Sequence, residues 1–270
     1  KDRMKKILFF FLLIGFVTLS ACGKSEDASS SNGDSEESKE LKVVTDAAFA
    51  PFEYMEGDKV VGFDADLGKA VLEEAGYTMN FEHVGWENML LQTEQGDADL
   101  AIAGISITDE RKETYDFSSP YFVSTQMILV PEDSEVESVA DLEDKTVGVQ
   151  ISTTGDIEAS RIFGENSDQI KKYEQVPLAI MGMKTGDIDA VIVDNVVAQE
   201  YMKTNPDEGI KGVYDNESFE EEFYGFMFPK GSEIVGELDE ALQTVIENGT
   251  YTKIYKEWFG QEPDLEALQK

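Results

Sequence analysis

The sequence predicts an α/β fold built from mostly parallel β-sheets. Between residues 42 and 260, short apolar segments rich in β-branched residues alternate with segments whose apolar residues recur at helical spacing. Residues 91–102 and 181–192 share the order helix, Gly-Asp-x-Asp, buried strand, and the glycine of each is typical of a helix C-cap. This repetition indicates two lobes of similar build.

The individual elements follow from local side-chain patterns. Apolar and β-branched runs predict strands at 41–45, 77–83, 99–103, 126–130, 146–150 and 190–193, with a strand or turn at 60–63. Helical spacing predicts helices at 64–75, 88–95, 136–142, 155–163, 178–185 and 195–203, another that 105–111 leads into, and a helical tail at 234–258 broken near Gly249. Ligands of such sheets bind beside the carboxyl ends of strands, which here precede residues 46–52, 104–111, 150–156 and 194.

Composition limits what the chain can bind. Of its 270 residues 41% are hydrophobic, and 56 acidic against 22 basic side chains give a net charge of -34. We exclude nucleic acid as a partner, because a phosphate-backbone binder needs a basic surface, and self-repulsion favours a monomer. Cys22 is the only cysteine and His83 the only histidine. We therefore expect no internal disulfide, no metal site and no cofactor.

Residues 1–22 have the pattern of a secretory signal peptide. Two lysines follow Met4, the expected true start, and precede an apolar run at 7–19, shorter than the roughly 20 residues of a spanning helix. The run ends in Leu-Ser-Ala-Cys22-Gly, which resembles a bacterial lipobox, although an ordinary signal peptide could carry an incidental cysteine. Lipidation of Cys22 would anchor the protein at the extracytoplasmic face of the cell membrane, with the Ser- and acid-rich residues 23–40 as a flexible tether.

The segment after the third expected strand carries the first candidate binding groups. Ala103 ends that strand, and Gly104 lets a ligand approach the backbone. Ser106 offers a hydroxyl, and Arg111 a planar fork that can hold one carboxylate by two parallel hydrogen bonds. Thr108 is a credible helix N-cap. The ordinary alternative is that Arg111 pairs with a nearby surface acid.

Other candidates also follow expected strands. Gln150, Thr153 and Thr154 lead into a helix, whose free N–H groups and two hydroxyls can hold an anion, or can form a plain capped helix. Asp46 and Asp194 each follow a strand, where a carboxylate can hold an ammonium group; Asp194 could equally cap the next helix.

Three aromatic side chains could pack on the aliphatic chain of a ligand, although each alone is more often part of a core: Phe49, Phe52 and Trp86. Taken together, one arginine, two acids, hydroxyls and aromatics complement an α-carboxylate, an α-ammonium group and a polar tip on an alkyl stem. The residues thus predict a cleft for a free polar amino acid.

Six motifs occur in one order between about residues 41 and 262. They read Thr45-Asp-Ala-Ala-Phe-Ala-Pro-Phe-Glu, Val61-Gly-Phe-Asp-Ala-Asp-Leu, Ala103-Gly-Ile-Ser-Ile-Thr-Asp-Glu-Arg, Asp116-Phe-Ser-Ser-Pro-Tyr, Thr153-Thr-Gly and Asn248-Gly-Thr-Tyr-x-x-Ile-Tyr-x-x-Trp-Phe-Gly. In this order they resemble the polar amino-acid binding proteins of ABC importers, bacterial solute-binding protein family 3, which includes glutamine-binding and lysine/arginine/ornithine-binding proteins.

The resemblance implies a fold and a partner. The fold would be the two-lobed periplasmic-binding-protein fold of type II, an α/β fold with two crossover strands. Lobe one would hold 41–124 plus 226–262, lobe two 125–225, and 263–270 would form a C-terminal tail. The protein would bind a free polar amino acid and deliver it to the transmembrane subunits of an ABC permease.

The resemblance also implies roles for the candidate residues. Arg111, helped by Ser106 and Thr154, matches the group that grips the ligand carboxylate. Asp194 and the carbonyl oxygen of Gly104 match the groups that receive the α-ammonium. Asp46 matches the acid that meets the tip of the ligand side chain. Phe49 and Trp86 match the aromatics that sandwich this side chain.

Departures from the glutamine-binding pattern favour a cationic ligand. Glutamine binders carry a lysine at the place of Gln150 and a histidine at that of Val193, and Ile151-Ser152 stands where Ser-Gly or Leu-Gly is usual. The acids of the site then outnumber Arg111, which favours arginine, lysine, ornithine or histidine over glutamine and argues against acidic ligands.

Three alternatives stay open. The first is a glutamine- or cystine-binding importer protein. The second is an enzyme, since a cyclohexadienyl dehydratase uses a related fold; no Ser-His-Asp set or metal cluster supports it. The third is a signalling module, which usually adjoins a transmembrane helix and a cytoplasmic domain; we expect neither here.

Overall fold

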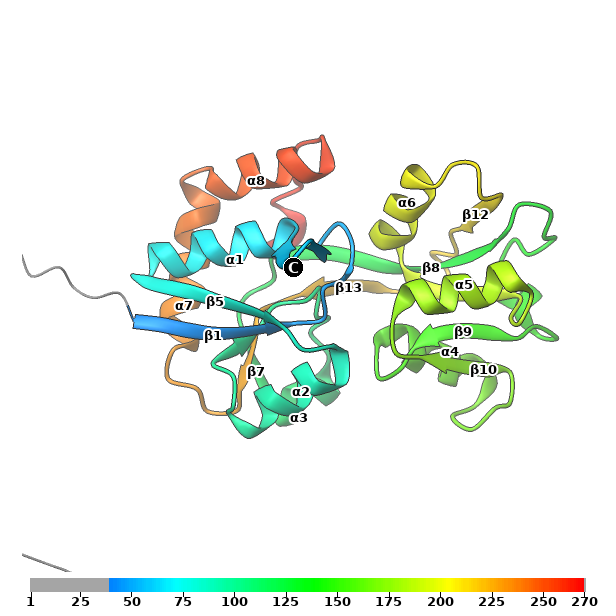
Figure 1. Cartoon of the computed structure of the whole chain (residues 1–270), viewed down its shortest axis with the longest axis horizontal. Helices are drawn as coiled ribbons and strands as arrows, with labels where there is room; N and C mark the ends of the chain where they lie inside the picture. Colours follow the sequence, from blue (N-terminus) through cyan, green and yellow to red (C-terminus); the bar gives the residue numbers. More distant parts are fainter. Residues whose placement is uncertain (1–38, 270) are drawn as a thin grey trace, which may run out of the picture. The chain divides into compact units, whose positions relative to one another are not determined.

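Two β-sheets organise the part of the chain that the computed structural model describes, residues 39–269 (Figure 1). The first sheet contains, in spatial order, β5 (Tyr77–His83), β1 (Lys39–Thr45), β6 (Leu100–Ala101), β14 (Met227–Pro229) and β7 (Tyr115–Phe117). The second contains β10 (Ile170–Tyr173), β9 (Val147–Gln150), β11 (Ala190–Asp194), β8 (Phe122–Pro131) and β12 (Ile210–Val213). A ribbon after β1 comprises β2 (Ala48–Phe49), β3 (Glu53–Glu56) and β4 (Lys59–Val61).

The N-terminal predictions fall largely outside this part of the chain. The expected signal peptide, the lipidation site Cys22 and residues 23–38 are not among the described residues. The last two residues of the expected tether, Lys39 and Glu40, instead begin β1 and pair with β5. Within residues 39–269, no helix is both long enough and apolar enough to cross a membrane.

Each sheet is parallel at one edge and antiparallel at the other, so the prediction of mostly parallel sheets is wrong for part of each. β1 runs parallel to β5 and β6, and β9 runs parallel to β10 and β11. β14 is antiparallel to β6 and β7, and β8 is antiparallel to β11 and β12. Parallel neighbours need a crossover, usually a helix. The connections that precede β8 and β14 instead contain no helix, and they lead from one sheet to the other.

Two strands connect the sheets. The first four residues of β8 pair with β13 (Glu221–Tyr224), and the remainder of β8 joins the second sheet. β7 ends shortly before β8, and β14 begins shortly after β13, so β8 leads from the first sheet to the second and β13 leads back (Figure 1). This confirms the two-lobed α/β fold with two crossover strands. The lobe boundaries at 124/125 and 225/226 stay predictions.

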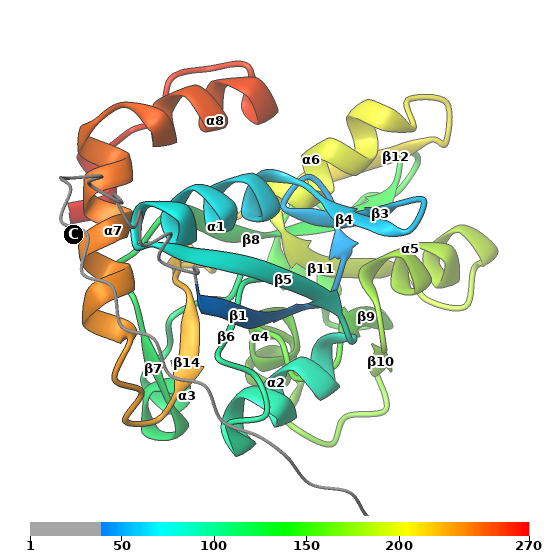
Figure 2. The ribbon, with the colours of Figure 1, turned by 60° about the vertical axis from the view of Figure 1, so that its left-hand side comes forward.

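Helices cover both faces of each sheet (Figure 2). On the first sheet, α1 (Phe63–Glu74), α7 (Val235–Glu247) and α8 (Thr250–Phe259) pack together, and α2 (Trp86–Gln95) packs on the other face. On the second, α5 (Val176–Thr185) and α6 (Asn195–Thr204) share one face, and α4 (Thr154–Phe163) covers the other. The predicted break in the helical tail is confirmed at Gly249, between α7 and α8.

Three shorter helical segments also occur in the described part of the chain, the last of which is a 3₁₀ turn at Ala267–Gln269. α3 (Asp109–Thr114) follows the expected N-cap Thr108, whose hydroxyl accepts a hydrogen bond from the Arg111 backbone N at 3.1 Å. The helix expected at 136–142 is a single 3₁₀ turn, Val139–Leu142. The expected tail at 263–270 is not free along its length, because Leu265 and Leu268 pack against the core.

The Gly-Asp-x-Asp repeat forms the same turn in both lobes. Gly96 and Gly186 end their helices in the left-handed conformation, with φ 73 and 81. The second aspartate of each repeat then accepts a backbone N–H from the neighbouring strand: Asp99 Oδ2 from Lys42 at 2.8 Å and Asp189 Oδ2 from Thr146 at 2.7 Å. The repeat therefore fixes the start of one parallel pairing in each sheet.

Candidate functional site

One cavity between the lobes gathers eleven of the twelve residues predicted to bind a ligand. Its lining residues are Asp46, Phe49, Glu53, Trp86, Ala103, Gly104, Ser106, Arg111, Gln150, Thr153, Thr154 and Asp194. They lie at or after the carboxyl ends of β1, β5, β6, β9 and β11, as expected for ligand-binding groups of such sheets.

Arg111 reaches across the cavity from one lobe to the other. Its Nη1 donates to the Ser106 carbonyl at 2.9 Å, and its Nη2 donates to the Ser152 carbonyl of the second lobe at 3.2 Å. The guanidinium carbon lies 5.3 Å from the ring centroid of Trp86, a cation–π arrangement. Burial lowers the pKa of Arg111, and the negative charges of Glu222 and Asp194 oppose this. The group keeps its charge and has three further N–H donors.

The Ser152 carbonyl accepts hydrogen bonds from two side chains that line the cavity. In the sequence, Ser152 stood out only because glycine is usual at this place. Its carbonyl accepts Trp86 Nε1 at 3.3 Å as well as Arg111 Nη2. Its φ of 60 is the left-handed conformation that glycine adopts readily. The Asp156 carboxylate accepts the Ser152 backbone N–H at 3.0 Å and pairs with Lys172 at 2.8 Å, which fixes this strained turn.

Asp46 lies at another part of the cavity wall and is 1% exposed. Its Oδ2 accepts the side-chain amide of Gln150 from the second lobe at 2.8 Å, and Oδ1 is buried without a hydrogen bond of standard geometry. Burial raises the pKa of Asp46, and the Gln150 hydrogen bond lowers it by less. A buried carboxylate with a neutral partner and a free lone pair is a suitable acceptor for a cation.

Asp194 is the last residue of β11 and does not cap α6 with its side chain. Its Oδ2 instead accepts the hydroxyls of Tyr224 and of Ser124, the latter at 3.3 Å. Burial raises the pKa of Asp194 to about 7, and the charge of Glu222 is the next cause. Of the two roles the sequence left open, acceptor or cap, the geometry favours the acceptor.

Glu53 is the lining residue that sequence reasoning missed. It lies fully buried beside the equally buried Asp64, and burial together with the Asp64 charge raises the pKa of Glu53 well above its ordinary range. Asp64 accepts the Gly104 backbone N at 2.8 Å and the Tyr121 hydroxyl at 2.9 Å. A protonated Glu53 carries no charge, so it adds no negative charge beside Asp64. The Asp64 carboxylate in turn fixes the backbone of Gly104, whose φ is 53.

The start of α4 forms another wall of the cavity. The Thr153 hydroxyl caps the helix by accepting the Asp156 backbone N at 3.4 Å, and it donates to the Gln150 carbonyl at 2.8 Å. Thr154 is the first helical residue, and its hydroxyl accepts the Gln126 side-chain amide at 3.3 Å. The Thr153 hydroxyl therefore serves the helix, whereas Thr154 keeps its hydroxyl proton for another acceptor.

The aromatic candidates separate into two groups. Phe49 lines the cavity and lies against Gly104. A Cβ added to Gly104 would come within 2.9 Å of the Phe49 ring. Phe52 does not line the cavity: it is fully buried, with its ring 4.8 Å from Phe122 and 5.2 Å from Tyr224. Phe52 was expected to contact a ligand. Its ring instead packs against aromatic side chains of the crossover strands, and this position does not fit that expectation.

The lining side chains leave little room in the cavity. The space is about 20 Å³, close to what a single water molecule occupies. Donors of one lobe are satisfied by acceptors of the other, as in the contacts of Gln150 with Asp46 and of Arg111 with Ser152. A ligand larger than water can enter only if some of these contacts open.

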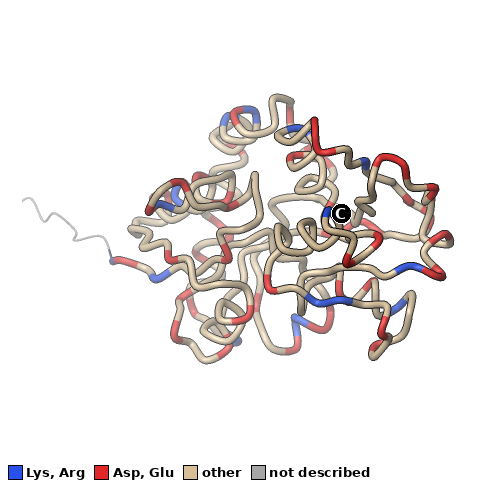
Figure 3. The backbone as a smooth tube through the Cα atoms, turned by 45° about the vertical axis from the view of Figure 1, so that its right-hand side comes forward, with Lys and Arg blue, Asp and Glu red and all other residues tan. Residues whose placement is uncertain are grey.

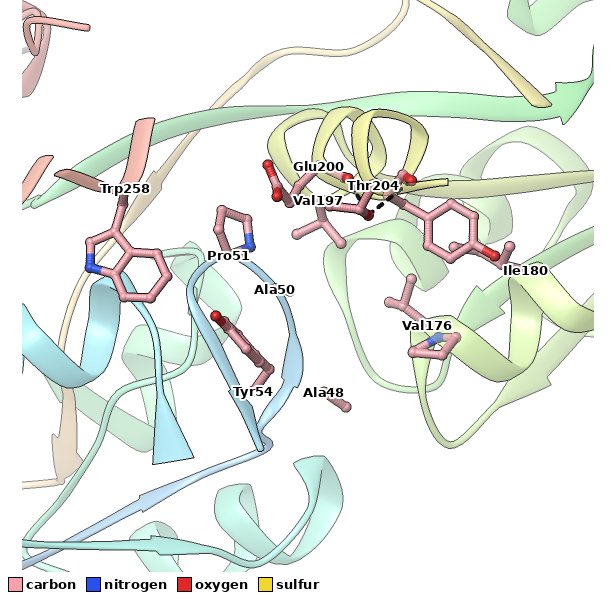
Figure 4. A pocket seen from close by; sticks show the side chains of 12 residues that line it. Ala48, Ala50, Pro51, Tyr54, Val176, Ile180, Val197, Glu200, Thr204 and Trp258 are labelled. Carbon is pink, nitrogen blue, oxygen red and sulfur yellow. Dashed lines mark hydrogen bonds between the residues drawn. The ribbon is translucent and has the colours of Figure 1, made fainter. Parts of the chain in front are cut away.

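A second hollow lies between the lobes, and it is larger and mostly apolar. Its volume is about 370 Å³, and it is lined by Ala48, Ala50, Pro51, Tyr54, Val176, Pro177, Ile180, Val197, Glu200, Tyr201, Thr204 and Trp258. Figure 4 shows Tyr54, Pro51 and Trp258 facing the side chains of α5 and α6 across it. Among the described residues that line it, Glu200 alone is charged, so this hollow offers no cation to a carboxylate.

Acidic residues occur along the backbone of both lobes (Figure 3). This wide distribution does not point to a binding site, but three acids come together at the cavity. Asp46, Glu53 and Asp194 line it, and Arg111 is the one cation among its described lining residues. No group of His, Cys, Asp or Glu within residues 39–269 is arranged to hold a metal ion.

Comparison with known proteins identifies the family to which this arrangement belongs. Residues 41–261 match the bacterial extracellular solute-binding proteins, family 3. The chain belongs to this family. The chain is accordingly a solute-binding protein, and the relatives that it resembles are named as binding proteins rather than enzymes.

Individual members of family 3 are similar over nearly the whole chain. A probable histidine-binding protein of Neisseria gonorrhoeae is 38% identical, covering 96% of this chain and 97% of its own. The arginine-binding extracellular protein ArtP of Bacillus subtilis (strain 168) is 33% identical, covering 96% and 100%. The crystal structure of the arginine-, lysine-, histidine-binding protein ArtJ of Geobacillus stearothermophilus has 49% identity and a TM-score of 0.85, covering 86% of this chain and 100% of its own.

Proposed function

We propose that this protein is the extracytoplasmic substrate-binding lipoprotein of an amino-acid ABC importer, and that it binds a free L-amino acid with a cationic side chain. The observation that carries the proposal is one cavity lined by a single arginine and by separate buried carboxylates, Arg111, Asp194 and Asp46. A zwitterion with a cationic tip carries one negative and two positive groups, which is the complement of this set.

The carboxylate of the ligand is assigned to Arg111. Three N–H groups of its guanidinium remain after the bonds to the carbonyls of Ser106 and Ser152. The Thr154 hydroxyl and the first N–H groups of α4 lie in the same wall and add donors at a helix N-terminus. A bidentate bond to a carboxylate would use the planar fork of arginine, which lysine lacks.

The α-ammonium is assigned to Asp194 and to the carbonyl oxygen of Gly104. The partners of Asp194 are neutral, namely the hydroxyls of Tyr224 and Ser124 and the Gln126 amide, so its charge is not already paired with a cation. The Asp64 bond to the Gly104 N–H fixes the peptide that presents this carbonyl. An ionised Asp194 would gain the opposite charge that its buried position lacks.

The side-chain tip is assigned to Asp46, with Phe49 and Trp86 along the aliphatic stem. A cationic tip would take the place of the Gln150 amide on Asp46 and satisfy the buried Oδ1 atom. An acidic tip would meet Asp46 unpaired and is expected to be rejected. The relatives named for arginine, histidine and lysine support the same choice.

Binding requires the lobes to separate and close again. A cavity of about 20 Å³ does not admit an amino acid, so the contacts of Gln150 with Asp46 and of Ser152 with Arg111 would open first. The connection through two strands, β8 and β13, allows such a motion. The closed, loaded form would then engage the permease, and lipidation of Cys22 would keep the protein at the membrane.

Calorimetry at pH 8 with the purified 39–270 segment tests the proposal. Arginine, lysine, ornithine and histidine are titrated beside glutamine, cystine and glutamate. We expect the cationic amino acids to bind at least about tenfold more tightly than glutamine, which corresponds to about 1.4 kcal/mol, and glutamate not to bind. Preference for glutamine or cystine would overturn the choice of ligand, and conversion of any ligand, followed by NMR, would overturn the transport role.

A further inference from the structure

Two carboxyl groups face one another across the crossover strands. Asp194 ends β11 and pairs with Gln126 of β8, while Glu222 of β13 pairs with Ser124 of β8. Alternate residues of a strand point to the same face, so Ser124 and Gln126 share a face. The same face receives Asp194, Glu222 and Tyr224, as their hydrogen bonds confirm.

Glu222 is linked to the groups assigned to the ligand carboxylate. Its Oε2 accepts the Ser106 hydroxyl, and its Oε1 accepts the Gln126 amide at 2.8 Å. The same amide donates to Thr154 at 3.3 Å and also serves as a partner of Asp194. Glu222 is half-buried and does not line the cavity, so its influence on a ligand passes through these neighbours.

No cation pairs directly with either acid. Within residues 39–269, neither Asp194 nor Glu222 forms an ion pair with a lysine or arginine, although the Arg111 charge attracts both. The charge of Asp194 also acts on Glu53. Around Glu222, the adjoining hollow is also lined by Glu110, Glu158, Glu220 and Glu221, of which Glu158 pairs with Arg161 at 2.7 Å. Asp194 and Glu222 are therefore like charges on one face of β8, and within residues 39–269 neither has an ion pair of its own.

We propose that Glu222 is a positioning residue of the ligand site, which makes capture of the ligand's α-ammonium group by Asp194 expel a proton. The inference rests on the proposed function, in which that ammonium group meets Asp194. The O–H bond of the protonated Asp194 breaks, its electron pair stays on the carboxylate, and the proton passes to water. The ammonium group then replaces the proton as the partner of Asp194.

The direction of the pH dependence follows from the free site. Burial, and next the charge of Glu222, raise the pKa of Asp194 to about 7. Below that pH the ligand must displace a proton, so affinity falls as the pH falls; above it Asp194 is already ionised and affinity levels off. Removing the Glu222 charge should lower the inflection by about one pH unit.

Calorimetry with L-arginine at pH 6 and pH 8.5 tests the inference. Titrations in buffers of different ionisation enthalpy should report release of about one proton per ligand at pH 6 and close to none at pH 8.5, with affinity about tenfold weaker at pH 6. In the Glu222→Gln variant the ratio between the two affinities should shrink to about twofold. Because each variant is compared with itself, a general loss of affinity does not imitate this result.

Two variants serve as controls. Glu220→Gln removes an exposed charge next to the same strand, and His83→Gln removes the histidine that faces Asp46. Both should keep the tenfold ratio. An unchanged ratio in Glu222→Gln, or a reduced ratio in either control, would overturn the role of Glu222. Binding with equal affinity at both pH values overturns this inference alone, whereas absence of arginine binding at either pH overturns it together with the proposed function.

Discussion

The polar cavity and the apolar hollow both lie between the lobes, but they differ in size and in what their walls can bind. The hollow has about 370 Å³ and the cavity about 20 Å³. The hollow is walled by proline, tyrosine, tryptophan and aliphatic side chains, with Glu200 as its only charge. The cavity contains Arg111, three acids and the start of a helix.

This difference indicates that the kind of lining groups, and not the volume of the space, identifies the binding site. An amino acid needs converging charge partners to replace its hydration, and only the cavity has them. The cavity is small because its own groups satisfy one another across the lobes, as in the bond from Gln150 to Asp46. Its polar groups are thus already directed inward, which is the arrangement that a charged ligand can use after the lobes open.

The largest effect is expected from Arg111→Ala. The variant leaves the ligand carboxylate in the cavity without its cation, and truncating one partner of a buried charge pair costs about 2–5 kcal/mol. We expect arginine affinity, measured by calorimetry at pH 8, to fall by at least about 100-fold. Arg111→Lys retains the positive charge but lacks the planar fork, so its affinity for arginine should lie between that of the unaltered protein and that of Arg111→Ala. Retained affinity in Arg111→Ala would break the assignment of the carboxylate.

A more selective effect is expected from Asp46→Asn. The amide keeps the shape of the side chain but removes the charge that meets a cationic tip. Arginine affinity should fall by about 30-fold or more, equivalent to about 2 kcal/mol. Glutamine and citrulline, whose tips are neutral, should change by less than about threefold. Equal losses for arginine and citrulline would show that Asp46 does not read the charge of the side chain.

The smallest effect is expected in the apolar hollow. Tyr54→Ala removes a half-buried ring that packs edge-on against Trp258, with centroids 6.2 Å apart. We expect the free energy of unfolding to fall by about 1 kcal/mol, and arginine affinity to change by less than about threefold. Urea denaturation and calorimetry on the same preparation separate the two. A loss of affinity as large as that of Asp46→Asn would mean that the hollow, too, belongs to the binding site.

Much of this comparison was accessible from the sequence. Helices and buried strands carry strong periodic patterns, and the polar segments after β1, β6, β9 and β11 therefore indicated where the site lies. Strands β2, β3, β7, β10, β12, β13 and β14 were missed, because each has at most four residues, too few for a periodic pattern; β13, for example, reads Glu-Glu-Phe-Tyr. Pairing across the fold, which a local pattern does not contain, makes them strands.

Three site residues show where sequence reasoning stops. Phe52 and Glu53 are neighbours in the sequence. Phe52 was expected in the site and Glu53 was overlooked, but Glu53 lines the cavity and Phe52 does not; only the fold decides which of the two side chains faces the cavity. Glu53 carried a signal, an acid inside an apolar stretch, that was not used. Ser152 appeared as a departure from glycine, but its part in the site is a backbone carbonyl, and no side-chain pattern reveals that.

A crystal structure of the protein with L-arginine tests the central claim most directly. We predict that the ligand carboxylate lies on the Arg111 guanidinium, the α-ammonium within hydrogen-bonding distance of Asp194, and the guanidinium tip beside Asp46, with the Gln150 amide displaced from that acid. Arginine in the hollow between Tyr54 and α6, or in the cavity with its carboxylate away from Arg111, would contradict the account.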